Sequence, residues 1–84
     1  MDHTVFGNRS ASYHNLKNFD KALEDAEKCI AILPSWGKGF QRKGMALHGL
    51  KKWEDAMAAL AKGAELDPTN AQIKTAMDNL RRDF

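Results

Sequence analysis

Cysteine, proline and long apolar runs are scarce in this chain of 84 residues. The single cysteine, Cys29, excludes an intramolecular disulfide and any zinc site that is built from paired cysteines. No apolar run approaches the roughly 20 residues that a membrane span needs, and no signal-peptide core opens the sequence. We therefore expect a cytoplasmic protein that has no membrane partner.

An excess of charge of one sign is also absent. The 13 Lys and Arg residues against 11 Asp and Glu residues give a net charge of +2, which offers no general electrostatic case for binding nucleic acid. One modest basic stretch lacks the interleaved aromatics that stack on bases, and it consists of Lys38, Arg42, Lys43, Lys51 and Lys52. We therefore expect no nucleic-acid partner, and steep salt-dependent binding of oligonucleotides would contradict this.

What the sequence does have is an internal repeat with a period of 34 residues. Shifting the chain against itself by 34 residues gives seven identical pairs: Phe6 with Phe40, His14 with His48, Leu16 with Leu50, Lys17 with Lys51, Ala22 with Ala56, Lys28 with Lys62, and Pro34 with Pro68. The two repeats run over residues 3–36 and 37–70, and residues 71–84 follow them.

Each repeat is predicted to form two helices. Aromatic and aliphatic residues recur at helical spacing over about 4–16, and an apolar stripe with spacings of three and four covers about 19–33. Pro34 and Pro68 lie just beyond the second helices, where proline is expected because it lacks an N–H. Small residues, Ser10 and Gly44, mark the expected helix crossings.

The last fourteen residues are predicted to form an amphipathic capping helix over 71–84. Its apolar face consists of Ile73, Ala76, Met77 and Leu80, and its other positions are polar. Terminal helices of this kind cover the last apolar surface of a helical array and keep it soluble. The sequence therefore predicts one all-α domain, a helical-hairpin solenoid of two repeats (four helices) with a C-terminal capping helix.

The period and four positions within it resemble tetratricopeptide repeats. These positions are an aromatic at the fourth (Phe6, Phe40), a small residue at the eighth (Ser10, Gly44), Ala at the twentieth (Ala22, Ala56) and Pro at the thirty-second (Pro34, Pro68). The sequence departs from the family pattern at Arg9, Lys43, Ala26 and Gly63. We expect Gly63 inside its helix to cost about 1 kcal/mol relative to alanine.

Three polar residues are predicted to meet on one face of this fold. Asn8 and Arg42 share the sixth position of their repeats, and Lys38 lies one helical turn before Arg42. In the tetratricopeptide family, the first helices of successive repeats line a concave groove, so the resemblance implies that all three side chains face it. An amide, an ammonium and a guanidinium together suit a carboxylate ligand.

Segments 3–11 and 36–43 are similar to the second and third repeats of carboxylate-clamp co-chaperones, which include those that link the seventy- and ninety-kilodalton heat-shock chaperones. The resemblance implies that Asn8, Lys38 and Arg42 hold the C-terminal Glu-Glu-Val-Asp of a chaperone tail. It favours the seventy-kilodalton class and leaves the ninety-kilodalton class open. The family clamp has two further members on a preceding repeat, so we expect the chain to be a fragment lacking an N-terminal repeat.

The remaining candidates are weaker. Ala11, Met45 and His48 are predicted to be auxiliary groove contacts for an apolar tail residue, although Met45 also suits core filling. Arg9 and Lys43 are interpreted as mainly solvating residues, and Cys29 as a small core residue. No catalytic constellation, phosphate-binding loop or metal-ligand spacing is found, and we place the carboxylates on outer helix faces. We therefore expect no enzymatic activity, no cofactor and no metal.

One alternative function stays open. The repeats can serve as a structural or assembly module that packs against another protein or against a second copy, without recognising a tail. The first helix pair is expected to expose an apolar face that an upstream repeat would otherwise cover, and such faces favour self-association.

Overall fold

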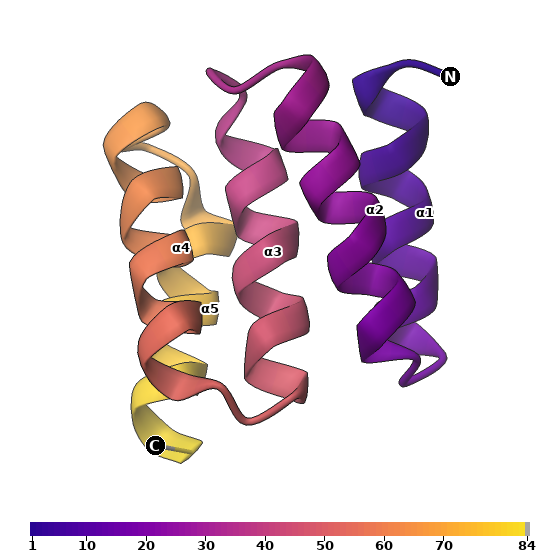
Figure 1. Ribbon diagram of the computed structural model, residues 1–84. Coiled ribbons are helices and arrows are strands. Elements are labelled where there is room, and N and C mark those ends of the chain that lie inside the picture. Colours follow the sequence, from indigo (N-terminus) through magenta and orange to yellow (C-terminus); the bar gives the residue numbers. More distant parts are fainter. Residues whose placement is uncertain (84) are drawn as a thin grey trace.

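The computed structural model describes residues 1–83, which form five α-helices. They are α1 (His3–Asn15), α2 (Phe19–Ile32), α3 (Gly37–Gly49), α4 (Trp53–Leu66) and α5 (Ala71–Asp83) (Figure 1). The predicted all-α class with hairpins and a final helix is confirmed, and α1 and α2 each end one residue before their predicted ends. Phe84, the last residue of the predicted capping segment, lies outside the described residues.

The helices are arranged in two layers. The α1–α2 and α3–α4 hairpins pack through α2 against α3, and Figure 1 shows α3 between the first hairpin and α4. Helix α1 also contacts α3, and α3 contacts α5, so α1, α3 and α5 form one layer while α2 and α4 form the other. Equivalent positions of α1 and α3 therefore lie on the same side of the molecule. Within residues 1–83, no helix has the length and apolar character that crossing a bilayer requires.

Small residues allow the helices of each hairpin to approach closely, as the sequence predicts. The Ser10 hydroxyl donates a hydrogen bond of 2.7 Å to the carbonyl of Ala22, which is fully buried on α2. At the equivalent crossing in the second hairpin, a Cβ atom added to Gly44 would lie 2.5 Å from Leu60 Cγ. Only glycine fits there without displacing the core.

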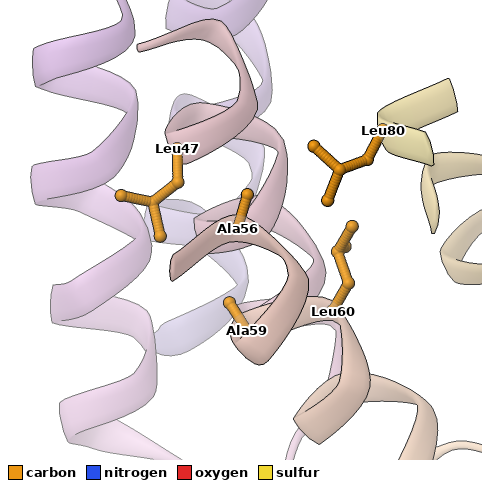
Figure 2. Packing of buried hydrophobic residues seen from close by; sticks show 5 residues of the cluster. All are labelled: Leu47, Ala56, Ala59, Leu60 and Leu80. Atoms are coloured by element: carbon orange, nitrogen blue, oxygen red, sulfur yellow. The ribbon is translucent and has the colours of Figure 1, made fainter. Parts of the chain in front are cut away.

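The main core lies between α3, α4 and α5. Figure 2 shows its buried residues, which are Leu47, Ala56, Ala59, Leu60 and Leu80. Leu80 is fully buried on α5, and Ile73 of the same helix is almost fully buried. Helix α5 therefore covers the end of the array with the apolar face that the sequence predicts.

Both hairpin turns end their first helix in a left-handed residue. After α1, Lys17 has a φ of 62°, its N–H donates to the His14 carbonyl at 2.9 Å, and the Asn18 N–H donates to the Tyr13 carbonyl at 2.8 Å. After α3, Lys51 has the same φ and its turn repeats the same pair of bonds. This is the Schellman pattern, whose left-handed position is usually glycine. Each turn therefore places lysine in a conformation that carries a steric cost.

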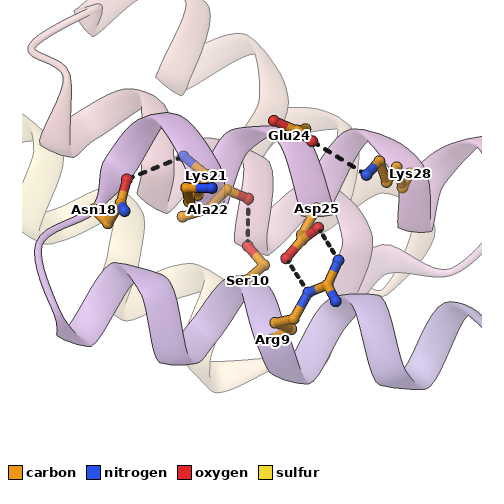
Figure 3. Close-up of polar contacts among 8 residues, drawn as sticks. All are labelled: Arg9, Ser10, Asn18, Lys21, Ala22, Glu24, Asp25 and Lys28. Carbon is orange, nitrogen blue, oxygen red and sulfur yellow. Dashed lines mark hydrogen bonds and ion pairs between the residues drawn. The ribbon is translucent and has the colours of Figure 1, made fainter.

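The interpretation of Arg9 as a mainly solvating residue is wrong. Arg9 donates from Nε and Nη2 to the two carboxylate oxygens of Asp25, at 2.7 and 2.9 Å, and the Asp25 side chain is only 3% exposed (Figure 3). The carboxylates are thus not confined to outer faces. Lys43 lies half-buried 3.9 Å from Glu27. A buried carboxylate needs a partner, and Arg9 supplies it across the α1–α2 crossing.

Gly63 also has a role that the expected helix cost does not include. A Cβ atom at this position would lie 3.2 Å from the Gly37 carbonyl oxygen and 3.2 Å from Ile73 Cδ1. The glycine therefore permits α4 to approach the start of α3 and the first turn of α5 closely. An alanine would gain helix propensity but would force these neighbours apart.

Candidate functional site

The three predicted clamp residues lie on the first helices of the two hairpins. Asn8 is exposed on α1, Lys38 is exposed on α3, and Arg42 is half-buried one turn after Lys38. Because α1 and α3 are in contact, the helix that bears Asn8 lies beside the helix that bears the two cations. Their joint role in binding stays a prediction.

Arg42 differs from the other half-buried cations of residues 1–83. Three Lys or Arg side chains in that range are half-buried, namely Arg9, Arg42 and Lys43. Arg9 pairs with Asp25 and Lys43 pairs with Glu27, whereas Arg42 has no carboxylate within ion-pair distance among the described residues. The half-buried Arg42 guanidinium thus has no carboxylate acceptor within the described residues.

Burial lowers the pKa of the Arg42 guanidinium, and the neighbouring Cys29 thiol offsets this only in part. Arginine nevertheless stays charged in proteins, so the half-buried group remains a cation with all its N–H donors. A cation that is partly removed from water without a counter-ion is unfavourable until an anion approaches it. Arg42 therefore presents charged N–H donors that no carboxylate among residues 1–83 occupies.

A cavity of about 380 Å³ opens beside Arg42, between α3 and α5. Its lining consists of Gln41, Arg42 and Met45 of α3 and Ala71, Gln72, Thr75, Ala76 and Asn79 of α5. The lining includes methyl and thioether groups as well as amides, so the cavity offers both apolar contact and hydrogen-bond donors. This mixture suits a peptide backbone with alternating side chains.

An amide network around the buried Gln41 holds α5 against this side of α3. Gln41, of which 2% is exposed, donates from Nε2 to Gln72 Oε1 at 3.3 Å and accepts from Asn70 Nδ2 at 3.3 Å. Asn70 Oδ1 in turn accepts from the backbone N–H groups of Gln72 and Ile73, at 2.9 and 3.2 Å. The network therefore sets the position of one wall of the cavity.

Our sequence analysis missed Gln41 and its partners. The available signal was the repeat register, since Gln41 replaces Gly7 at the same position of the first repeat. Gly7 is buried with Trp36 close by, which leaves no room for an amide in the first hairpin. A large polar residue at a position where the other repeat has glycine was a sign of a specific polar contact.

A second cavity of about 310 Å³ continues the first one toward the end of α3. It is lined by His14, Phe19, Met45, His48, Gly49, Ala76, Asn79, Arg82 and Asp83. Met45, Ala76 and Asn79 line both cavities, so the two form one continuous trough. We call this trough, with the residues that line either cavity, the α3–α5 groove.

Two of the three predicted auxiliary residues lie in this groove. Met45 lines both cavities and His48 lines the second. Ala11 is half-buried on α1, one turn after Asn8, and neither cavity is lined by Ala11, Asn8 or Lys38. The structure thus joins Arg42, Met45 and His48 in one groove, and Asn8 and Lys38 stay on the neighbouring helix surfaces.

Other chemistry receives little support from the described residues. No group of three or more His, Cys, Asp or Glu side chains in residues 1–83 is arranged to hold a metal ion. Cys29 is fully buried, as predicted, and burial raises the pKa of its thiol despite the opposing charge of Arg42. A thiol of this kind is a poor nucleophile at neutral pH.

A separate apolar cavity of about 430 Å³ lies between α4 and α5. Trp53, Met57 and Leu80 form its floor, and Glu54 and Arg81 flank it. It lies apart from Arg42 and shares only the helix α5 with the α3–α5 groove. Apart from Glu54 and Arg81, its lining is apolar.

Several curated relatives of the chain carry heat shock proteins in their names. The chain is 37% identical over 83 residues to the Hsp70-Hsp90 organising protein of Plasmodium falciparum. This match covers 99% of the chain and 33% of that protein. The chain is 42% identical over 81 residues to heat shock protein STI1 of Saccharomyces cerevisiae. This match covers 96% of the chain and 14% of that protein. The chain spans a third or less of the length of these two relatives.

Solved structures with the same fold include peptide complexes. The first TPR domain of Spaghetti (RPAP3) bound to the HSP90 peptide SRMEEVD matches with a TM-score of 0.87 and 27% identity, over 98% of this chain and 65% of that chain. The second TPR domain of human RPAP3 in complex with the HSP70 peptide SGPTIEEVD matches with a TM-score of 0.88 and 25% identity. This match covers 95% of this chain and 67% of that chain.

The sequence model of the tetratricopeptide repeat family matches residues 3–35 and 38–70, which together make up most of the chain. This match agrees with the 34-residue period and with the two hairpins that the structure shows. The chain belongs to the tetratricopeptide repeat family.

Proposed function

We propose that this chain is a non-catalytic, cytoplasmic co-chaperone adaptor that binds the acidic C-terminal Glu-Glu-Val-Asp tail of a heat-shock chaperone. The observation that carries the proposal is Arg42, a half-buried cation on the groove wall that has no carboxylate partner among residues 1–83. Lys38 adds a second positive charge one turn away, and Asn8 adds an amide donor on the adjacent helix. Together they form a partial carboxylate clamp.

The relatives support this choice of ligand. Two of the matched structures hold peptides that end in Glu-Glu-Val-Asp, and two of the matched proteins are named for heat-shock chaperones or heat shock. We propose the seventy-kilodalton chaperone tail as the preferred partner. Segments 3–11 and 36–43 are similar to the second and third repeats of carboxylate-clamp co-chaperones, and this resemblance favours the seventy-kilodalton class. The ninety-kilodalton tail ends in the same four residues and is the direct competitor to test.

The proposal is tested by calorimetric titration with the peptide SGPTIEEVD as a free acid and as its C-terminal amide. We expect the amide to bind more weakly, because the clamp loses one of the two oxygens of the terminal carboxylate and its charge. Arg42→Ala is expected to remove about 1.5 to 3 kcal/mol of binding free energy, the range for hydrogen bonds to charged groups. Lys38→Ala is expected to act in the same direction but less, since Lys38 is exposed.

Lys62→Ala is the matched control, because Lys62 is an exposed cation on α4 that pairs with Glu65 outside the groove. Its removal changes the net charge as much as Lys38→Ala does, and we expect no change in affinity beyond a weak long-range effect. Equal binding of the free acid and the amide by the unmodified chain would refute the proposal.

A second candidate function is assembly through the outer face of α1. Val5 is 42% exposed and Leu16 is 75% exposed, whereas their equivalents Gly39 and Leu50 on α3 are buried and half-buried. Gly39 packs against Ile30 of the preceding helix α2, so the corresponding site on α1 lacks such a neighbour within residues 1–83. Strictly monomeric sedimentation at high concentration would argue against this function.

A further inference from the structure

The far end of the α3–α5 groove already holds a carboxylate of the chain itself. Asp83 Oδ2 lies 2.8 Å from His48 Nε2, and Asp83 Oδ1 lies 3.8 Å from Arg82 Nε. All three residues line the cavity of about 310 Å³ at this end. The groove therefore offers a second place where cationic groups converge on one carboxylate, at a distance from Arg42.

The intramolecular pair is open to replacement. The Asp83 side chain is 47% exposed and the His48 side chain is 23% exposed, so water reaches the pair. Ion pairs at such exposed positions contribute little, because solvent screens them and two side chains must be held in place. A carboxylate of a ligand that is already bound elsewhere in the groove has a high effective concentration at His48, so it can compete with Asp83.

The spacing along α3 determines which ligand residue would reach His48. Arg42 and His48 are six residues apart on one helix, which corresponds to about 9 Å along its axis. An extended peptide advances about 3.3 Å per residue, so about three peptide residues cover this distance. Met45 lies between the two positions and lines both cavities, so the path is continuous.

We propose that His48 is a second carboxylate-binding residue of the groove, and that an acidic side chain three residues before the C-terminus of the ligand displaces Asp83 from it. This inference rests on the proposed function, because the terminal carboxylate at Arg42 sets the register. The ligand class is an acidic peptide with two anchoring points. The first glutamate of Glu-Glu-Val-Asp occupies the required position.

The charge of this end of the groove depends on pH. The groups that face His48 are His14 of α1, Arg82 and Asp83 of α5, and the ring of Trp53 of α4, whose centroid lies 5.7 Å away. Burial lowers the pKa of His14, a hydrogen bond with the Asn15 side chain opposes this, and the positive charges of His48 and Arg42 lower the pKa further. A protonated imidazole attracts a carboxylate by its charge as well as by its N–H groups, whereas a neutral imidazole offers only one N–H. An acidic side chain at this end is therefore attracted more strongly at low pH than at high pH.

The test compares the peptides SGPTIEEVD and SGPTIQEVD by calorimetric titration at pH 6 and pH 8. For the unmodified chain, we expect the glutamate peptide to bind about two- to fivefold more tightly at pH 6, the range of an exposed ion pair, and we expect a smaller ratio at pH 8. His48→Gln is expected to abolish this ratio at pH 6. Asp83→Asn, which removes the competing carboxylate, is expected to raise the affinity for the glutamate peptide and leave that for the glutamine peptide unchanged.

An unchanged ratio in His48→Gln at pH 6 would overturn the inference, as would an Asp83→Asn variant that binds both peptides as the unmodified chain does. Far-UV circular dichroism of both variants confirms that they are folded before binding is measured. The proposed function fails separately, when the unmodified chain binds the glutamine peptide equally well as a free acid and as an amide. If the unmodified chain prefers the free acid but His48→Gln leaves the ratio between the two peptides unchanged, the inference about His48 is wrong and the proposed function stands.

Discussion

Asn70 joins the start of α5 to α3, and we expect Asn70→Ala to destabilise the fold by more than the loss of a helix cap. Its Oδ1 accepts from the N–H groups of Gln72 and Ile73, and its Nδ2 donates to Gln41 Oε1 at 3.3 Å and to Asp67 Oδ2 at 3.2 Å. Alanine removes all four interactions. The Gln41 amide oxygen would then lie in a buried position without its donor.

The magnitude follows from two parts. Loss of an asparagine cap costs about 1 kcal/mol. Leaving the buried Gln41 oxygen unsatisfied costs about 1 to 3 kcal/mol more, since Gln41 is only 2% exposed. We therefore expect the free energy of unfolding to fall by about 2 to 4 kcal/mol. At about 4 to 8 °C per kcal/mol for a domain of this size, the melting temperature should fall by at least about 8 °C.

Urea unfolding followed by tryptophan fluorescence measures this loss, and Asn18→Ala is the matched control. Asn18 caps α2 with a single exposed bond of 3.4 Å to the Lys21 N–H, so its removal should cost about 0.5 to 1 kcal/mol. Asn70→Ser, which keeps a cap acceptor and loses the contact with Gln41, should lie between the two. If Asn70→Ala costs no more than Asn18→Ala, the Gln41 network does not hold α5 in place.

Two further predictions concern backbone strain and pH. Lys17→Gly and Lys51→Gly should each raise the free energy of unfolding by about 0.5 to 1 kcal/mol, because φ is 62° at both positions. Urea unfolding measures this gain. Lys74→Gly, inside α5, is the control that should destabilise the fold. The lowered pKa of His14 means that the unfolded chain binds its proton first as the pH falls, so stability should decrease from about pH 7 to pH 5. His14→Gln should flatten that decrease in the urea midpoint, and an unchanged pH profile would contradict it.

Much of the fold could be predicted because residues with the same structural role occur at equivalent positions of both repeats. The positions that had to be small, Ser10 and Gly44, are those where helices cross, and the hairpin turns recur at Lys17 and Lys51 with the same dihedral angle. The buried pair of Arg9 and Asp25 could not be predicted in the same way. Its acid has no counterpart in the second repeat, where Ala59 takes the place of Asp25, so the register shows that this position differs but does not show which residue pairs with the acid.

The three candidate clamp residues that the sequence indicates all lie on the first helices of the hairpins, for a similar reason. Repeat symmetry relates α1 to α3, and it therefore identifies Asn8 and Arg42 together and Lys38 one turn away. Helix α5 lies outside the repeats, so its groove residues have no equivalent position from which to infer their direction. Only the contact of α5 with α3 shows that Asn79 and Asp83 form the opposite wall.

The two repeats differ where function is expected, and the pattern of charge pairing indicates which differences matter. At the seventh position, both repeats carry a cation, and both cations are paired with a carboxylate of α2, through Asp25 for Arg9 and Glu27 for Lys43. At the sixth position, one repeat has a neutral amide and the other has Arg42, for which residues 1–83 provide no carboxylate. Charges that serve the fold are neutralised within it, so the half-buried cation left without a partner is the one that an external carboxylate would stabilise.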